Sequence, residues 1–305
     1  MEYTTLGNSG IEVSRLCAGC MSFGDPASKM HALDLGINFF DTANCYSAGT
    51  SEEYLGRAIR NNTARDRVVL ATKVYFNEGR LSKNAILREV EGSLRRLGTD
   101  YIDLLIIHRF DYDTPVGETM EALHKVVQSG KVRAIGASAM YGYQFMEMQY
   151  TAEKNGWTKF VSMQNHYNLL YREDERELIP ICDTQNVART PYSPLAAGRL
   201  SRPTWSADTL RSRTDVTAQG KYDKTRESDM VIVKRVSELA EKKDATMTQI
   251  ALAWQFAKGA ASPVIGATKA KYLDDAAGSF SVKLSKEEID YLEEAYVPHH
   301  VVGAL

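Results

Sequence analysis

Short runs of aliphatic and β-branched residues alternate along the chain with longer segments in which apolar positions recur every three or four residues. This alternation is typical of βαβ units, which build a parallel sheet covered by helices. The runs that predict strands cover residues 16–21, 37–41, 67–73, 101–108, 132–138, 159–164, 187–192 and 262–266. Eight such units predict an α/β fold of the (β/α)8 TIM-barrel type.

The longer segments predict amphipathic helices, because one side of each helix would be apolar and could pack on the sheet. The clearest periodicity covers residues 82–97, 116–128, 144–154 and 247–257. Ser82 stands where an N-cap is expected, and Gly98 stands where that helix would end. Helical patterns over residues 229–242 and 286–295 fall outside the alternation and predict two extra helices.

The N-terminal residues predict a β-hairpin that precedes the first barrel strand. The turn-forming tetrapeptide of residues 7–10 separates two short runs, residues 3–6 and 11–14. Such a hairpin could cover the N-terminal end of the barrel. No linker or internal repeat interrupts the chain, and barrels of ~250 residues or more form around one core, so residues 1–305 are expected to be a single domain.

The segment that connects the first two predicted strands is short for a parallel crossover. A parallel crossover takes a dozen or more residues and is usually helical. Between Met21 and Ile37, residues 24–26 predict a turn and only residues 31–35 resemble a helix. Either this crossover is truncated by a natural deletion or a segment is missing from the sequence. The stretch of residues 75–80 after the third strand is similarly brief.

Composition places the chain among ordinary soluble proteins and directs attention to small molecules. Hydrophobic residues make up 44% and charged residues 25%, and the net charge of −2 gives no reason to expect nucleic acid or anionic membranes as partners. No apolar run approaches the ~20 residues that span a bilayer, and the N-terminus lacks a signal-peptide pattern. A cytoplasmic protein that acts on a small molecule is therefore expected.

The cysteine pattern favours structural roles. Four cysteines in a chain of this length do not make a disulfide framework. Cys17 and Cys20 lie three positions apart in a predicted strand, so their side chains should point to opposite faces. This spacing favours packing over a redox or shared metal role.

Polar residues stand where three of the apolar runs end. Asp41 ends the second predicted strand, Lys73 the third and His108 the fourth, and Tyr46 follows Asp41 in the next loop. The carboxyl ends of barrel strands meet at one face, where the active sites of this fold lie. Each residue alone is more often a helix cap or a structural polar group. Together, however, they are expected to share one pocket.

The four residue types make a chemical unit that can protonate a carbonyl. A tyrosine has an ordinary pKa of ~10 and is a poor acid near neutrality without help. The Lys73 ammonium would lower the pKa of Tyr46, and Asp41 would keep Lys73 charged and oriented. His108 could hydrogen-bond the carbonyl oxygen and hold it near the Tyr46 hydroxyl.

The sequence around these residues resembles the aldo-keto reductase superfamily. The resemblance is carried by residues 37–46, 71–73 and 105–108, and extends from the hairpin through Ala295. Asp41, Tyr46, Lys73 and His108 match the catalytic tetrad of that family. Residues 162–172 and 298–303 are similar, more narrowly, to the bacterial YajO-like branch. The resemblance implies NADPH-dependent reduction of an aldehyde or ketone by hydride transfer, with Tyr46 as the general acid.

The resemblance also implies where the cofactor NADP(H) binds. No G-x-G-x-x-G follows a strand, so a dinucleotide needs a cradle other than a Rossmann fold. Ser138 and Gln164 would hold the carboxamide, and Tyr192 would stack on the nicotinamide unless it is a core aromatic. Gly266, Thr268 and Lys269 would meet the adenosine phosphate end, unless Lys269 is an ordinary solvated lysine. The other residues expected at the cofactor are Gly19, Met21, Asp41, Ser193, Leu195 and Tyr272.

Other functions stay open at this point. A metal-dependent barrel hydrolase needs several ligands around one ion, whereas the histidines here are scattered, so no metal site is expected. Some aldo-keto reductase relatives are auxiliary subunits that hold NADP with little turnover, because fold does not fix function. The complete tetrad favours an enzyme over that role. The YajO-like resemblance also allows a role in forming 1-deoxy-xylulose 5-phosphate.

Overall fold

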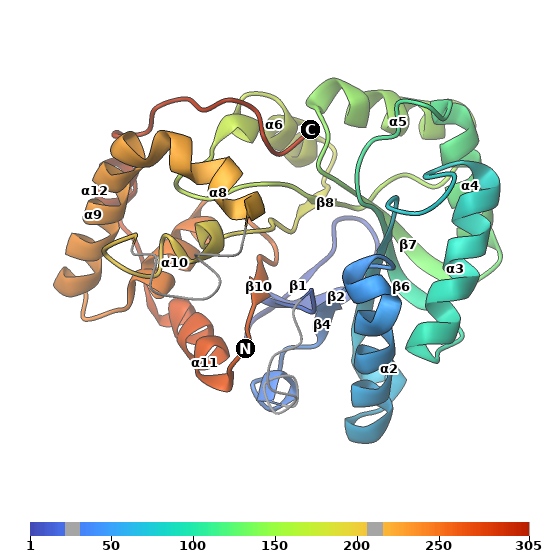
Figure 1. The fold of residues 1–305 in the computed structure, drawn as a ribbon, viewed down its shortest axis with the longest axis horizontal. Coiled ribbons are helices and arrows are strands. Elements are labelled where there is room, and N and C mark those ends of the chain that lie inside the picture. The colour runs from blue at the N-terminus through green and yellow to red at the C-terminus, as the bar shows by residue number, and fades with distance from the viewer. Residues whose placement is uncertain (22–30, 206–215, 305) are drawn as a thin grey trace.

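The computed structural model describes residues 1–21, 31–205 and 216–304 (Figure 1). Eight parallel strands form one curled sheet in the order β10-β3-β4-β5-β6-β7-β8-β9, which confirms the predicted (β/α)8 barrel. The strands are β3 Cys17–Gly19, β4 Phe39–Asp41, β5 Val69–Val74, β6 Ile102–Ile107, β7 Val132–Ser138, β8 Ser162–Gln164, β9 Ala188–Arg189 and β10 Val264–Gly266.

Hydrogen bonds between the segments of β9 and β10 close the sheet. The amide of Ala261 donates to the carbonyl of Arg189 at 2.8 Å, and the amide of Val264 donates to that of Pro191 at 2.9 Å. These bonds join the two strands that end the sheet order, so the barrel has no open edge at this seam.

Helices surround the sheet, as Figure 1 shows for α2 to α5 beside β4 to β7. Four predicted helices are confirmed closely as α3 Lys83–Leu97, α4 Val116–Gln128, α5 Gly142–Lys154 and α10 Met247–Ala257. The two extra helices are present as α9 Arg226–Lys242 and α12 Lys286–Glu293. The remaining helices are α2 Thr50–Asn62, α6 Leu178–Thr184, α8 Val216–Tyr222 and α11 Ala270–Gly278. No helix within the described ranges is long and apolar enough to cross a membrane.

Both ends of α3 lie where the sequence predicted. Gly98 ends the helix with φ +64°, a left-handed conformation that glycine adopts at little cost. Ser82 occupies the N-cap position, but its side chain makes no capping hydrogen bond. The carboxylate of Glu118 instead accepts from the amide of Lys83 at 2.9 Å. A charged acceptor from α4 therefore satisfies one of the free amides at the start of α3.

Several strands are shorter than predicted, and for β8 and β9 the cause is local. β8 begins at Ser162 rather than 159, because the amide of Phe160 donates to the side chain of Gln149 at 2.8 Å instead of to a strand. β9 covers only Ala188–Arg189 of the predicted 187–192. Pro191 has no amide hydrogen to offer a neighbouring strand, which limits continuous pairing there.

The hairpin β1 Tyr3–Thr5 and β2 Glu12–Ser14 closes the N-terminal end of the barrel. Leu6, Ile11 and Val13 are buried in one cluster with strand residues such as Phe39 and Leu104. Cys17 belongs to this inner cluster, whereas Cys20 belongs to the outer cluster between strands and helices. The two cysteines thus face opposite sides of the sheet, as their spacing predicted.

The short crossovers are only partly visible. The predicted turn at residues 24–26 lies outside the described residues, and residues 31–34 are helical. The segment between β5 and α3 is a loop of turns over residues 75–82. It leads directly from the strand that carries Lys73 to the next helix.

Candidate active site

Strand alternation directs three of the tetrad side chains into the barrel. Side chains two positions apart on a strand point to the same face. Ala71 lies in the inner cluster and Lys73 follows it by two positions, as Asp41 follows the inner residue Phe39. His108 likewise follows Ile106, another member of that cluster. These residues continue the inner face of β4, β5 and β6 to its carboxyl end.

A buried ion pair forms the centre of the site. The Lys73 ammonium donates to Asp41 Oδ1 at 2.5 Å and to the carbonyl of Thr42 at 2.8 Å. Lys73 is fully buried and Asp41 is only 3% exposed. The second oxygen of Asp41 accepts from Gln164 Nε2 at 2.9 Å. Two acceptors, on β4 and in the loop after it, therefore hold the Lys73 ammonium, and Gln164 on β8 in turn holds Asp41.

Tyr46 reaches the same ammonium from the loop after β4. It begins a short 3-10 turn, Tyr46–Gly49, and its hydroxyl accepts from Lys73 Nζ at 3.4 Å. Ser47 and Ala48 have φ of +48° and +53°, which is uncommon for residues other than glycine. This strained turn follows the tyrosine directly and fixes how the chain leaves the site.

Burial changes the acid–base balance expected from the sequence. Burial alone would lower the pKa of Lys73, but the charges of Asp41 and Tyr46 and the hydrogen bonds to both residues together outweigh it and the pKa is raised, so Lys73 stays charged. Burial raises the pKa of Tyr46, and the opposing charge of Lys73 does not cancel this rise. Lys73 therefore lowers the pKa of Tyr46, as expected from the sequence, but burial has the larger effect and the net pKa is raised. Lys73 only limits the increase.

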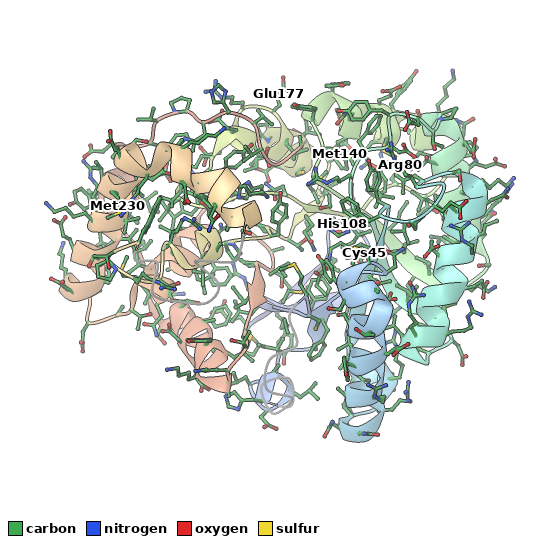
Figure 2. The ribbon with its side chains drawn as sticks, viewed as in Figure 1. Cys45, Arg80, His108, Met140, Glu177 and Met230 are labelled. Atoms are coloured by element: carbon green, nitrogen blue, oxygen red, sulfur yellow. The ribbon has the colours of Figure 1, made fainter. Side chains whose placement is uncertain are left out.

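His108 lies against Tyr46 as a neutral ring. The two rings meet edge to face with centroids 5.7 Å apart, and Phe76 contacts His108 from another side at 5.0 Å. Burial lowers the pKa of His108 to about 2, helped by the charges of Lys73 and Arg109. The imidazole therefore keeps one N–H donor at neutral pH. Figure 2 shows His108 beside Cys45, whose Sγ lies 4.0 Å from His108 Nδ1.

The two residues predicted to hold the nicotinamide carboxamide, Ser138 and Gln164, lie at neighbouring strand ends. Ser138 ends β7 and pairs in register with Gln164, which ends β8. Both are nearly buried, at 2% and 3% exposure, and Gln164 is already bonded to Asp41. On the other side of Asp41, Gly19 pairs with Asp41 in register and Gly266 pairs with Gly19. The structure thus brings these four predicted residues to the same end of the barrel as the tetrad.

Tyr192 is part of an aromatic stack that the sequence did not predict. Its ring lies parallel to that of His166, with centroids 5.1 Å apart, and His166 stacks in turn on Tyr171 at 4.2 Å. The Lys221 ammonium lies 4.7 Å from the centroid of Tyr192 and donates to its hydroxyl at 3.3 Å. Tyr192 is partly exposed, so it is not a core aromatic. Ser193, at φ +52°, and Leu195 continue the chain beside it.

The remaining predicted residues lie on the surface. Thr268, Lys269 and Tyr272 are exposed where α11 begins, with Lys269 at its N-cap position. Met21 is also exposed, at 54%, just after β3. Gly266 has open space beside it, since an added Cβ would meet no atom within 4 Å.

These groups fit a nicotinamide dinucleotide. The strand ends supply polar side chains at Ser138 and Gln164, Tyr192 supplies an aromatic ring, and Lys269 supplies a cation at a helix start, where exposed amides favour anions. The open space at Gly266 lets a ligand approach the backbone. By contrast, no three His, Cys, Asp or Glu side chains are grouped as metal ligands would be in the part of the chain described.

Sequence reasoning missed several neighbours of the tetrad. Cys45 and Arg109 each stand next to a predicted catalytic residue, so adjacency was the available signal. Phe76 lies in the short loop after β5, and its contact with His108 depends on tertiary packing. The stacking of His166 on Tyr171 and Tyr192 was not predicted. No sequence pattern marks Tyr171 as its neighbour, and Tyr192 lies far along the chain.

Comparison with known proteins agrees with this arrangement. The sequence model of the Aldo/keto reductase family matches residues 16–297. The chain is 44% identical to versiconal hemiacetal acetate reductase of Aspergillus parasiticus, over 98% of each protein. It is 43% identical to a putative aryl-alcohol dehydrogenase of Schizosaccharomyces pombe, over 99% of this chain and 98% of that protein. A putative aryl-alcohol dehydrogenase of Saccharomyces cerevisiae is 39% identical over 98% of each.

The same alignments are longer than this chain. The alignment with the Aspergillus reductase spans 339 positions, more than the 305 residues of this chain. That relative therefore contains positions with no counterpart here. Because the family match covers most of the residues and the relatives are similar over nearly their whole length, the chain belongs to the aldo/keto reductase family.

Proposed function

We propose that this protein is an NADPH-dependent reductase that converts an aldehyde or ketone to an alcohol, with Tyr46 as the general acid. The observation that carries the proposal is the contact of the Tyr46 hydroxyl with a buried Lys73 ammonium that Asp41 holds in place. A charged lysine beside a tyrosine stabilises the phenolate that remains after proton donation. An ion pair that only stabilised the fold would not require a tyrosine hydroxyl in contact with Lys73.

Each residue has a distinct task in this proposal. A reduced nicotinamide held by Ser138 and Gln164 would supply the hydride for the carbonyl carbon. Tyr46 donates its proton to the carbonyl oxygen, and Lys73 stabilises the resulting phenolate. His108, as a neutral N–H donor, hydrogen-bonds the carbonyl oxygen and orients it toward Tyr46. Asp41 acts through Lys73, which it keeps charged and fixed.

The substrate is proposed to be a small carbonyl compound. Family members typically use nicotinamide cofactors, and the relatives described above are named reductases and aryl-alcohol dehydrogenases. Aryl aldehydes are therefore the first substrates to test. These relatives are fungal, so they give no support to a place in the bacterial YajO-like branch, and the 1-deoxy-xylulose 5-phosphate role stays a prediction from sequence resemblance.

The proposal is tested by following NADPH oxidation with a panel of aryl and aliphatic aldehydes and ketones. The expected result is consumption of NADPH that depends on the carbonyl compound and yields the alcohol in equal amount. Firm binding of NADPH without consumption by any member of the panel would contradict the proposal. It would favour a protein that only holds the cofactor.

Cofactor preference is expected to depend on Lys269. Lys269→Ala should weaken NADPH binding roughly ten-fold or more while barely changing NADH, because a charge-assisted contact of ~1.5–3 kcal/mol to the 2′-phosphate would be lost. Fluorescence titration with both cofactors measures this. Lys283→Ala, which removes another exposed lysine, is the matched control and should bind both normally. Equal losses for NADPH and NADH in Lys269→Ala would mean that Lys269 does not read the 2′-phosphate.

A further inference from the structure

Arg109 lies at the candidate site without an assigned role. It directly follows His108, at the carboxyl end of β6. Its guanidinium carbon is 5.9 Å from the centroid of the Phe76 ring, and the same ring contacts His108 edge to face at 5.0 Å. Arg109 and His108 therefore share Phe76 as a neighbour, so the guanidinium lies near the imidazole of the candidate site.

The charge of Arg109 acts on two residues of the candidate site, His108 and Tyr192. It is one of the groups that lower the pKa of His108, after burial and Lys73. Burial raises the pKa of Tyr192, and the charge of Arg109 opposes that rise. Tyr192 follows β9, whereas His108 follows β6. A cation that influences both residues lies near the space between them.

The guanidinium of Arg109 has no protein anion to neutralise it among the described residues. No hydrogen bond or ion pair to its side chain is present within those ranges, and Nη1 is buried without a partner. Leaving a buried donor unsatisfied costs free energy. Arg80, on a neighbouring loop, shows the usual arrangement, since it pairs with Asp113 at 2.5 Å and lies 3.6 Å from Asp111. An unpaired guanidinium next to His108 therefore needs a partner from a ligand.

We propose that Arg109 binds a carboxylate carried by the substrate, so that the enzyme prefers carbonyl compounds with an anionic group. The guanidinium fork matches a carboxylate with two parallel hydrogen bonds. Phe76, which is 51% exposed, offers an apolar ring against which an aromatic substrate body can pack. This inference rests on the proposed reduction at Tyr46 and adds the substrate class to it.

Two aldehydes of matched shape test the proposal. 4-Formylbenzoate and 4-formylbenzamide differ chiefly in charge, so the ratio of their kcat/KM values isolates recognition of the carboxylate. We expect wild type to favour the benzoate and Arg109→Gln to lower the ratio roughly ten-fold or more. Arg109→Lys keeps the charge without the fork and should restore part of the ratio. Arg80→Gln removes an arginine that is already paired and should leave the ratio at its wild-type value.

Binding gives a readout that does not need turnover. Titration of 4-formylbenzoate, followed by intrinsic tryptophan fluorescence, should show binding that is at least ten-fold weaker in Arg109→Gln than in wild type. Equal affinities, or an unchanged ratio of kcat/KM, would overturn the proposal. Weaker NADPH binding with equal losses for both aldehydes would also overturn it, because Arg109 would then serve the cofactor. Failure of the proposed function is distinct, since wild type would consume no NADPH with either aldehyde.

Discussion

Tyr46→Phe is expected to lose most carbonyl reduction while it still binds NADPH. The substitution removes only the hydroxyl, which accepts from Lys73 and is proposed to protonate the carbonyl oxygen. General acid catalysis contributes typically 10²–10⁴-fold, so kcat should fall by about that factor. The phenyl ring can keep its edge contact with His108, so the pocket should stay folded.

Steady-state kinetics with a good aryl aldehyde, together with NADPH titration, measure both parts of this prediction. The loss should appear in the chemical step rather than in cofactor affinity. Near-wild-type turnover by Tyr46→Phe would rule out Tyr46 as the acid. Loss of NADPH binding in step with activity would instead indicate a structural role for the hydroxyl.

Lys73→Met is expected to impair both chemistry and stability. Lys73 is fully buried, and its removal leaves the Asp41 carboxylate in the barrel with only Gln164 as a side-chain donor among the bonds described for it. Breaking one partner of a buried pair costs about 3–5 kcal/mol, which denaturant unfolding measures. The double variant Asp41→Asn/Lys73→Met removes both charges and should recover much of that stability but not the activity.

The pH profile separates the catalytic effect of Lys73 from the structural one. Reduction needs the protonated phenol, so it persists below the raised pKa of Tyr46 and falls as pH rises through it. Oxidation of the alcohol needs the phenolate, so its rate should increase as pH rises through the same pKa. Without Lys73 the pKa of Tyr46 should rise further, so the pH at which oxidation sets in should move to more alkaline values. An unchanged rate and pH profile in Lys73→Met would make Lys73 a structural residue.

The periodicity of the sequence was sufficient to predict the barrel and where its polar strand ends lie. β7 begins and ends at the predicted residues, and Phe39 and Asp41 share the inner face because strand side chains alternate. Once the strands are parallel neighbours, Asp41, Lys73 and His108 must lie at one end of the barrel. The resemblance of residues 37–46 added the role proposed for Tyr46.

The remaining features depend on packing that one sequence does not specify. The net rise in the pKa of Tyr46 follows from how deeply the ring is buried, which strand spacing does not reveal. The stack of Tyr171, His166 and Tyr192 requires side chains to meet across loops. The hydrogen bond from the Lys83 amide to Glu118 depends on how α3 packs beside α4. Such contacts are tertiary, so local patterns miss them.

The most direct measurement of the central claim follows the hydride itself. NADPH carrying deuterium at both C4 positions of the nicotinamide is mixed with an aryl aldehyde and the protein, and the alcohol is analysed by mass spectrometry. Wild type should form alcohol with deuterium on the former carbonyl carbon, in proportion to the NADPH oxidised, whereas Tyr46→Phe should form almost none. Alcohol without deuterium, or no alcohol from wild type with NADPH bound, would contradict the assignment of this site as a carbonyl reductase.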